Sequence, residues 1–206
     1  MPSLRNVVMI SLMSLGCARP SLPPAARVEE AAALSREIAA RVRADQEVQQ
    51  RMLRAGQPSG AAEAQRDSVF RDNLEWMRGV LTTLGWPGTR LVGEEGSHGA
   101  WLLLQHADLD PELQRLALPL LEQAVRSGDA SGRDLAYLTD RVRIAAGELQ
   151  VYGTQLQYDR RGCASPRPSE DPARLDERRA RVGLEPMARY LHDTMEALGR
   201  AAQCAA

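Results

Sequence analysis

Apolar residues recur every three or four positions along most of the chain, which is the spacing of an amphipathic helix. The pattern predicts a long first helix from about Arg27 to Ala55, with Gly56 as its end. A second helix is expected from about Ala62 to Leu84, where the Gly85-Trp86-Pro87-Gly88 segment interrupts the pattern. The N-terminal part of the chain is therefore expected to fold as two consecutive helices.

Later helices are predicted from local capping signals, in which a polar side chain accepts a hydrogen bond from the first helical turn. The expected helix beginnings are Ser97, Asp110-Pro111-Glu112, Ser131, Asp171-Pro172 and Glu185-Pro186. The helix that follows Asp110 is expected to reach about Arg126 and to kink at Pro119, because proline removes a backbone donor. The helix that follows Ser131 is expected to end at about Ala146.

Residues 150–158 alternate between apolar and polar side chains, which is the period of a β-strand. We expect this strand to pair with residues 165–169, and Pro166 and Pro168 keep that second arm at an edge. The predicted fold class is mainly α: a single irregular bundle of about six to seven helices with one small β-hairpin. The helical domain is expected to span residues 27–206, with the hairpin near residues 149–169.

The first sixteen residues have the composition of a secretory signal peptide: Arg5, then an apolar run over residues 7–15 that is too short to span a bilayer. The Ser14-Leu15-Gly16-Cys17 sequence resembles the lipobox of bacterial lipoproteins, although Ser14 stands where a branched apolar residue is usual. We therefore expect a signal peptide over residues 1–16, a lipidated Cys17, and a tether over residues 17–26. The alternative is an ordinary secreted protein with a cysteine near the cleavage point.

This interpretation predicts a membrane-anchored lipoprotein of the cell envelope that faces the periplasm or the exterior. About 180 residues remain after the tether, enough for one domain with a core. The net charge of -1 gives no indication of a nucleic-acid partner. In an oxidising compartment Cys163 and Cys204 could form a disulfide, and the alternative is two unpaired thiols.

Several short motifs occur in an order that resembles a bacterial family catalogued only as a domain of unknown function. In chain order they are Asp45-Gln46, Asp72-Asn73, Gly85-Trp86-Pro87, Val92-Gly93, Gln105-His106-Ala107-Asp108, Gln114, Asp140-Arg141, Gln150, Tyr152-Gly153-Thr154-Gln155, Asp171-Pro172, Arg178-Arg179 and Gly183-Leu184. The resemblance covers roughly residues 45–190, and it implies no activity, cofactor or catalytic residue.

The polar residues of this pattern allow two hypotheses, because several lie on or beside apolar helix faces. In the first, they form a structural hydrogen-bond network, as in a non-catalytic interaction or scaffold lipoprotein. In the second, they line a pocket that binds or hydrolyses a small polar ligand, with His106 and Asp140 as the catalytic pair. The ligand-binding candidates are then Asp45, Asn73, Gln114, Arg141, Gln150, Tyr152 and Gln155.

Other candidate chemistry has weaker support. His98 and His106, with Asp108 or Asp110, offer metal ligands, but their spacing matches no recognised site, so we expect neither metal nor cofactor. His192 and the Arg178-Arg179-x-Arg181 run are expected on solvated faces. The sequence leaves open whether the protein is an enzyme.

Overall fold

The computed structural model describes residues 24–55, 59–106 and 110–204. The predicted signal peptide, Cys17 and most of the predicted tether lie outside these described residues. Among the described residues, no helix combines the length and the apolar character that crossing a bilayer requires. Within them the chain forms eight α-helices and one two-stranded sheet, which confirms the expected mainly α fold with a small hairpin.

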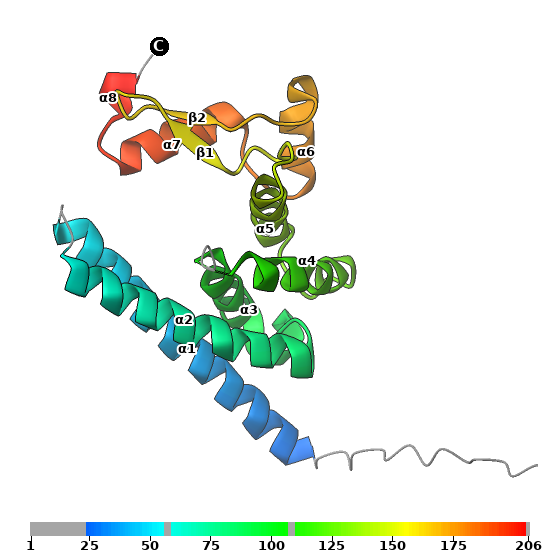
Figure 1. The fold of residues 1–206 in the computed structure, drawn as a ribbon. Helices are drawn as coiled ribbons and strands as arrows, with labels where there is room; N and C mark the ends of the chain where they lie inside the picture. The colour runs from blue at the N-terminus through cyan, green and yellow to red at the C-terminus, as the bar shows by residue number, and fades with distance from the viewer. Residues whose placement is uncertain (1–23, 56–58, 107–109, 205–206) are drawn as a thin grey trace, which may run out of the picture.

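Two long helices, α1 (Pro24–Ala55) and α2 (Gly60–Leu84), pack side by side at one end of the molecule (Figure 1). Helix α3 (Thr89–Gln105) packs against both of them, and α4 (Pro111–Arg126) packs against α2 and α5. Helix α5 (Gly132–Ala145) lies between this helical half and the C-terminal segments, as Figure 1 shows. It is therefore the element that joins the two halves.

The C-terminal half is built on a short hairpin. Strands β1 (Leu156–Tyr158) and β2 (Ala164–Pro166) are antiparallel, with Gln157 opposite Ser165. A 3-10 turn over Pro172–Arg174 leads into α6 (Leu175–Arg181), and α7 (Met187–Ala197) and α8 (Ala201–Cys204) complete the chain. Helix α7 packs against both β2 and α8.

The main core is formed by apolar side chains of α1 to α5. Its most deeply buried members include Ile38, Met77, Ala100, Leu103, Leu104, Leu113, Leu121 and Leu138. Trp86 and Trp101 are also buried, so tryptophan and leucine carry much of the apolar volume in a chain that has a single phenylalanine. The core therefore fixes α3 between the first helix pair and α5.

The third helix begins earlier than the sequence predicted. It starts at Thr89, and Gly93, with φ of 77°, interrupts its dihedral angles before the helix continues. The expected capping role of Ser97 is wrong, because Ser97 lies inside the helix and its Oγ accepts a hydrogen bond from Trp86 Nε1 at 3.0 Å. The break at Gly93 sets the direction from which residues 94–105 cross the bundle.

The predicted beginnings of α4 and α5 are confirmed. An Asp110 carboxylate oxygen accepts a hydrogen bond from the Leu113 amide at 3.1 Å, and Ser131 Oγ accepts one from the Asp134 amide at 3.5 Å. Pro119 lies inside α4 without ending the helix.

The predicted long strand over residues 150–158 is wrong for its first half. Only residues 156–158 form β1, whereas Gln150 makes an isolated bridge with Ser169 and Gly153 has φ of 70°. A residue with positive φ cannot continue a strand, and a Cβ at Gly153 would meet Met187 Cε at 2.4 Å. Residues 150–155 are therefore a loop held by tertiary contacts.

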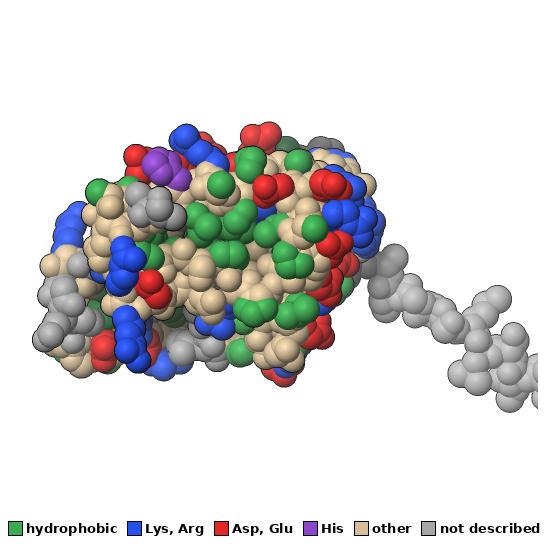
Figure 2. All heavy atoms as spheres, turned by 90° about the horizontal axis from the view of Figure 1, so that it is seen from above, with side chains coloured by type: hydrophobic (Ala, Val, Ile, Leu, Met, Phe, Trp, Pro, Cys, Tyr) green, Lys and Arg blue, Asp and Glu red, His purple; other side chains and the backbone are tan. Residues whose placement is uncertain are grey.

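Cys163 and Cys204 form a disulfide that joins the hairpin to α8. Beside it lies an apolar groove of about 490 Å³, whose lining includes Ala164, Leu191 and Met195. Figure 2 looks onto this end of the molecule, and apolar side chains gather on the face that it shows.

We predict that replacing both Cys163 and Cys204 by serine lowers the free energy of unfolding by about 4 kcal/mol. The bond closes a loop across 41 positions, and its loss restores conformational entropy to the unfolded chain. Urea unfolding of the two proteins measures the difference, and a reductant should produce the same loss in the unchanged chain. Equal stability of the double variant and the parent would contradict the prediction.

Candidate functional site

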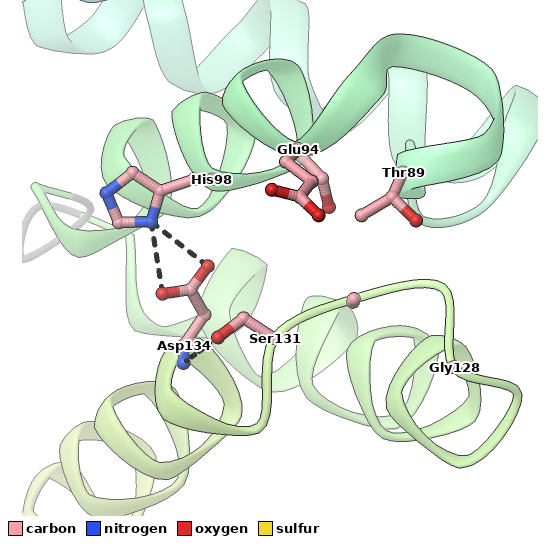
Figure 3. Close-up of a pocket in the computed structure, with 8 residues that line it drawn as sticks. Thr89, Glu94, His98, Gly128, Ser131 and Asp134 are labelled. Atoms are coloured by element: carbon pink, nitrogen blue, oxygen red, sulfur yellow. Dashed lines mark hydrogen bonds and ion pairs between the residues drawn. The ribbon is translucent and has the colours of Figure 1, made fainter. Parts of the chain in front are cut away.

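A polar cleft lies between α3, the N-terminus of α5 and the loop over residues 127–131 (Figure 3). Its volume is about 430 Å³. The described residues that line it are Thr89, Glu94, Ser97, His98, Gly128, Ala130, Ser131 and Asp134. Figure 3 shows the side chains of Glu94 and Asp134 reaching from α3 and α5 toward the space between these elements.

The central contact of the cleft joins His98 and Asp134. His98 Nδ1 lies 3.1 Å from both carboxylate oxygens of Asp134. The Asp134 side chain is 8% exposed and the His98 side chain 58% exposed, so a buried carboxylate orients an accessible imidazole. The ring of His98 also stacks on Trp101, with ring centroids 4.8 Å apart. No hydrogen bond of the described residues involves Nε2 of His98, which leaves this nitrogen available for proton exchange.

Local sequence explains how these groups meet. After the break at Gly93, α3 continues in helical geometry, so Glu94 and His98, four positions apart, share one face. Ser131 caps α5 and places Asp134 in its first turn, opposite His98. The cleft is therefore formed where two helices begin or resume.

The loop that closes the cleft is fixed by Asp129. One of its carboxylate oxygens accepts hydrogen bonds from Thr89 Oγ1 at 3.0 Å and from the Arg90 amide at 2.7 Å. Its backbone carbonyl accepts a third bond, from the Thr89 amide at 2.9 Å. Gly88 is required here, since a Cβ at this position would lie 2.2 Å from the Asp129 carboxylate.

Burial raises the pKa of the Asp134 carboxyl above its ordinary value, while the neighbouring His98 and Arg133 lower it. The burial effect is the largest, so Asp134 retains its proton to a higher pH than an exposed aspartate does. A titratable group with a raised pKa in a cleft is a common feature of functional sites.

A second histidine–aspartate pair lies inside the bundle. His106, whose side chain is 21% exposed, places Nδ1 2.8 Å and 2.9 Å from the two carboxylate oxygens of Asp45, which is almost fully buried. Its Nε2 lies 3.0 Å from Gln49 Nε2, and its ring stacks on Phe70. With the proton on Nδ1, the ring donates to Asp45 and accepts from Gln49. Both ring nitrogens of His106 are then occupied by α1 side chains.

Among the described residues, no hydrogen bond or ion pair joins Asp140, the other predicted catalytic residue, to His106. Its side chain is fully buried, and its carboxylate accepts hydrogen bonds from the amides of Val151, Tyr152 and Thr154 at 2.6 to 3.2 Å. The hydroxyl of Thr154 donates a further bond at 2.9 Å. These contacts hold the loop over residues 150–155 on α5.

The carbonyl groups of the same loop are bound by arginines of α6. Arg178 Nε donates to the Val151 carbonyl at 2.8 Å, and Arg179 Nη1 donates to the Tyr152 carbonyl at 2.8 Å. The expectation of a solvated face is wrong for Arg179, which is fully buried and lies over the Tyr190 ring at 4.9 Å. Its charge is stabilised by carbonyl oxygens and by the aromatic face.

Gln150 closes the ends of the loop. Its Nε2 donates to the carbonyls of Gln155 and Arg167, and its Oε1 accepts from the Gln155 amide at 2.9 Å. Gln155 Nε2 donates in turn to Thr154 Oγ1 at 3.1 Å. Burial and the nearby Asp140 charge raise the pKa of the Tyr152 hydroxyl. Three of the predicted ligand-binding residues, Gln150, Tyr152 and Gln155, therefore meet here, in one network around Asp140.

The remaining predicted ligand-binding residues make contacts outside the network around Asp140. Asn73 Oδ1 accepts from Arg41 Nη1 at 3.2 Å, Gln114 Nε2 donates to the Leu104 carbonyl at 3.0 Å, and Arg141 Nε donates to Gln105 Oε1 at 2.7 Å. Leu104 and Gln105 directly precede His106, so Gln114 and Arg141 bind the end of α3 beside the Asp45–His106 pair. Asn73 lies one turn from Phe70, whose ring stacks on His106. No hydrogen bond of the described residues joins this group to the network around Asp140.

Sequence analysis did not select the residues of the cleft, apart from considering His98 as a metal ligand. Two local signals could have indicated it: the four-residue spacing of Glu94 and His98, and the Ser131-x-x-Asp134 start of a helix. Neither signal shows that the two segments meet, because His98 and Asp134 are 36 positions apart.

His98 and His106 contact different aspartates, so the structure does not join them in a metal site. Among the described residues, one group of potential metal ligands has its ligand atoms within 4.8 Å of one another: His192, Asp193 and Glu196 on α7. His192 is exposed, as the sequence predicted.

Comparison with known proteins identifies the family. Residues 32–202 match a family of unknown function, DUF6624, and the chain belongs to this family. No curated protein and no solved structure matches the chain.

We predict that Asp140→Asn lowers the free energy of unfolding by more than about 3 kcal/mol. The amide of asparagine cannot accept all the bonds of the carboxylate, and buried N–H groups of the loop lose their partner. Chemical unfolding measures the loss, with Asp67→Asn as the control because that carboxylate contacts the adjacent Arg66 on α2. A loss no larger than that of the control would contradict the structural role.

We also predict that Asp45 and His106 stabilise the fold as a pair. A double-mutant cycle with Asp45→Asn and His106→Ala should give a coupling free energy of about 1 to 3 kcal/mol, because either substitution leaves the other side chain without its partner. Unfolding of the two single variants and the double variant provides the value. Additive losses would show that the two side chains act independently.

Proposed function

We propose that this member of the family is an envelope lipoprotein whose folded domain binds a small polar ligand in the cleft formed by His98 and Asp134. The observation that carries the proposal is the pairing of an accessible imidazole with a buried carboxylate at the wall of a cavity of about 430 Å³. A cavity of this size with a few polar groups is the usual form of a small-molecule site.

The pair has the groups that proton transfer requires. Asp134 fixes the orientation of His98, so Nε2 can accept a proton from a bound ligand or return one to it. His106 is less suited to this role, since Asp45 and Gln49 contact both of its ring nitrogens. The ligand-binding role is therefore assigned to His98, and hydrolysis of the ligand would use the same imidazole as its base.

The envelope location rests on the sequence. The apolar run over residues 7–15 and the Cys17 that follows have the order of a lipoprotein signal. The disulfide between Cys163 and Cys204 supports an oxidising compartment. A lipid on Cys17 would attach the protein to the membrane and leave the domain outside the cytoplasm.

The alternative is a non-catalytic scaffold protein. Asp140, Gln150, Arg178 and Arg179, which belong to the ordered motif pattern, bind backbone groups of one loop. Such residues would be needed in a scaffold and in a binding protein alike, because they fix the fold. The two functions differ in whether the cleft retains a ligand.

We predict that native mass spectrometry of the protein purified from its own host finds a small molecule bound to it. His98→Ala should lose this molecule and remain folded, because the His98 side chain is more than half exposed. The buried Asp134 loses its partner in this variant, so the protein loses some stability, and circular dichroism checks the fold. The matched control is His192→Ala, which removes a similarly exposed histidine from α7 and should retain the ligand. A protein without bound ligand, or equal retention by both variants, would contradict the proposal.

A further inference from the structure

The charged side chains around the cleft indicate the chemical class of the ligand, whereas the volume of the cleft indicates only its size. Glu94 lies on the face of α3 that carries His98, and its side chain points into the cleft (Figure 3). No hydrogen bond or ion pair of the described residues involves the Glu94 carboxylate. A carboxylate without a partner in a concave site attracts a positive group and repels an anion.

The opposite wall carries no cation among its described lining residues, and Arg133 acts on it only from outside the lining, where its charge lowers the pKa of Asp134. None of the described residues that line the cleft is an arginine, and the whole sequence contains no lysine. Arg133, which follows the capping segment of α5, is directed to Glu185 at 3.4 Å. Glu94 and Asp134 are therefore the carboxylates that line the cleft beside His98, and no arginine stands among the described lining residues.

Two hydroxyl groups supply the remaining polar contacts. Thr89 Oγ1 donates its proton to Asp129, so its oxygen can accept a hydrogen bond from a ligand. Ser131 Oγ accepts from the Asp134 amide, so its proton can be donated. Hydroxyl groups on a ligand can therefore be bound as both donors and acceptors.

We propose that the ligand of this cleft is a small cation, a primary amine that also carries hydroxyl groups, with its ammonium group bound by Glu94. This inference rests on the proposed binding function and adds the chemical class of the ligand. The ammonium group would lie between Glu94 and Asp134, and the hydroxyl groups would contact Thr89 and Ser131. The volume of about 430 Å³ accommodates a molecule of the size of one sugar ring.

Three probes of one size separate charge from shape. Glucosamine, glucose and glucuronate share a pyranose ring and differ by a positive, a neutral and a negative group. Titration of each into the ¹⁵N-labelled protein, followed by amide chemical shifts, should show glucosamine binding at least tenfold more tightly than glucose. Shifts should centre on residues 89–98 and 127–134, and glucuronate should produce none there. Added salt should weaken the binding of glucosamine.

Substitutions at two neighbouring glutamates test which carboxylate binds the ammonium group. Glu94→Gln should reduce the affinity for glucosamine about tenfold and leave the affinity for glucose unchanged. Glu95→Gln removes the same charge from the next position, which is exposed and does not line the cleft, and should leave both affinities unchanged. Equal effects of the two substitutions would overturn the role of Glu94.

The outcomes separate this inference from the proposed function. Tighter binding of glucose or glucuronate than of glucosamine would overturn the cationic ligand and still place a ligand in the cleft. Failure of all three probes to bind would overturn the hydroxylated amine class. Native mass spectrometry would then decide the proposed function. A neutral or anionic molecule that the parent protein retains and His98→Ala loses would support ligand binding in the cleft and contradict the cationic class.

Discussion

The Asp140 carboxylate is the group on which the arrangement of the C-terminal half depends. It accepts the amides of Val151, Tyr152 and Thr154 in the buried space beside α5. A loop without regular structure must find partners for each backbone group that it buries. Asp140 provides partners for the amides, and Arg178 and Arg179 of α6 provide them for the carbonyls. One loop is thereby fixed to two helices, and the hairpin that follows it is placed as a consequence.

Helix α5 connects this network with the candidate site. Asp134 in its first turn binds His98 of α3, and Asp140, six positions further along the helix, binds the loop. The same helix therefore carries one aspartate that faces an open cleft and one that is closed off from solvent. Their surroundings explain why two carboxylates six positions apart serve different roles: Asp140 has its acceptor capacity filled by backbone donors, whereas Asp134 orients a ring that remains accessible.

The sequence predicted those features that depend on local interactions. Capping by Asp110 and Ser131 was recognised because each cap bonds an amide three residues away. The alternation of residues 150–158 suggested a strand, but contacts with helices far along the chain override it in the first half. Arg179 was expected on a solvated face, but the carbonyl of Tyr152, 27 positions away, and that of Glu185 offset the cost of burying its charge. The cleft was missed for the same reason, since His98 and Asp134 meet only through the packing of α3 on α5.

Amide hydrogen exchange of the loop, resolved by NMR, tests the central claim most directly. In the unchanged protein the amides of Val151, Tyr152 and Thr154 should exchange as slowly as those of the core of α5, because a buried carboxylate holds them. In Asp140→Asn they should exchange at least a hundredfold faster than in the parent, and faster than the amides of α3 in the same variant. Equal protection of these three amides in the two proteins would contradict the account.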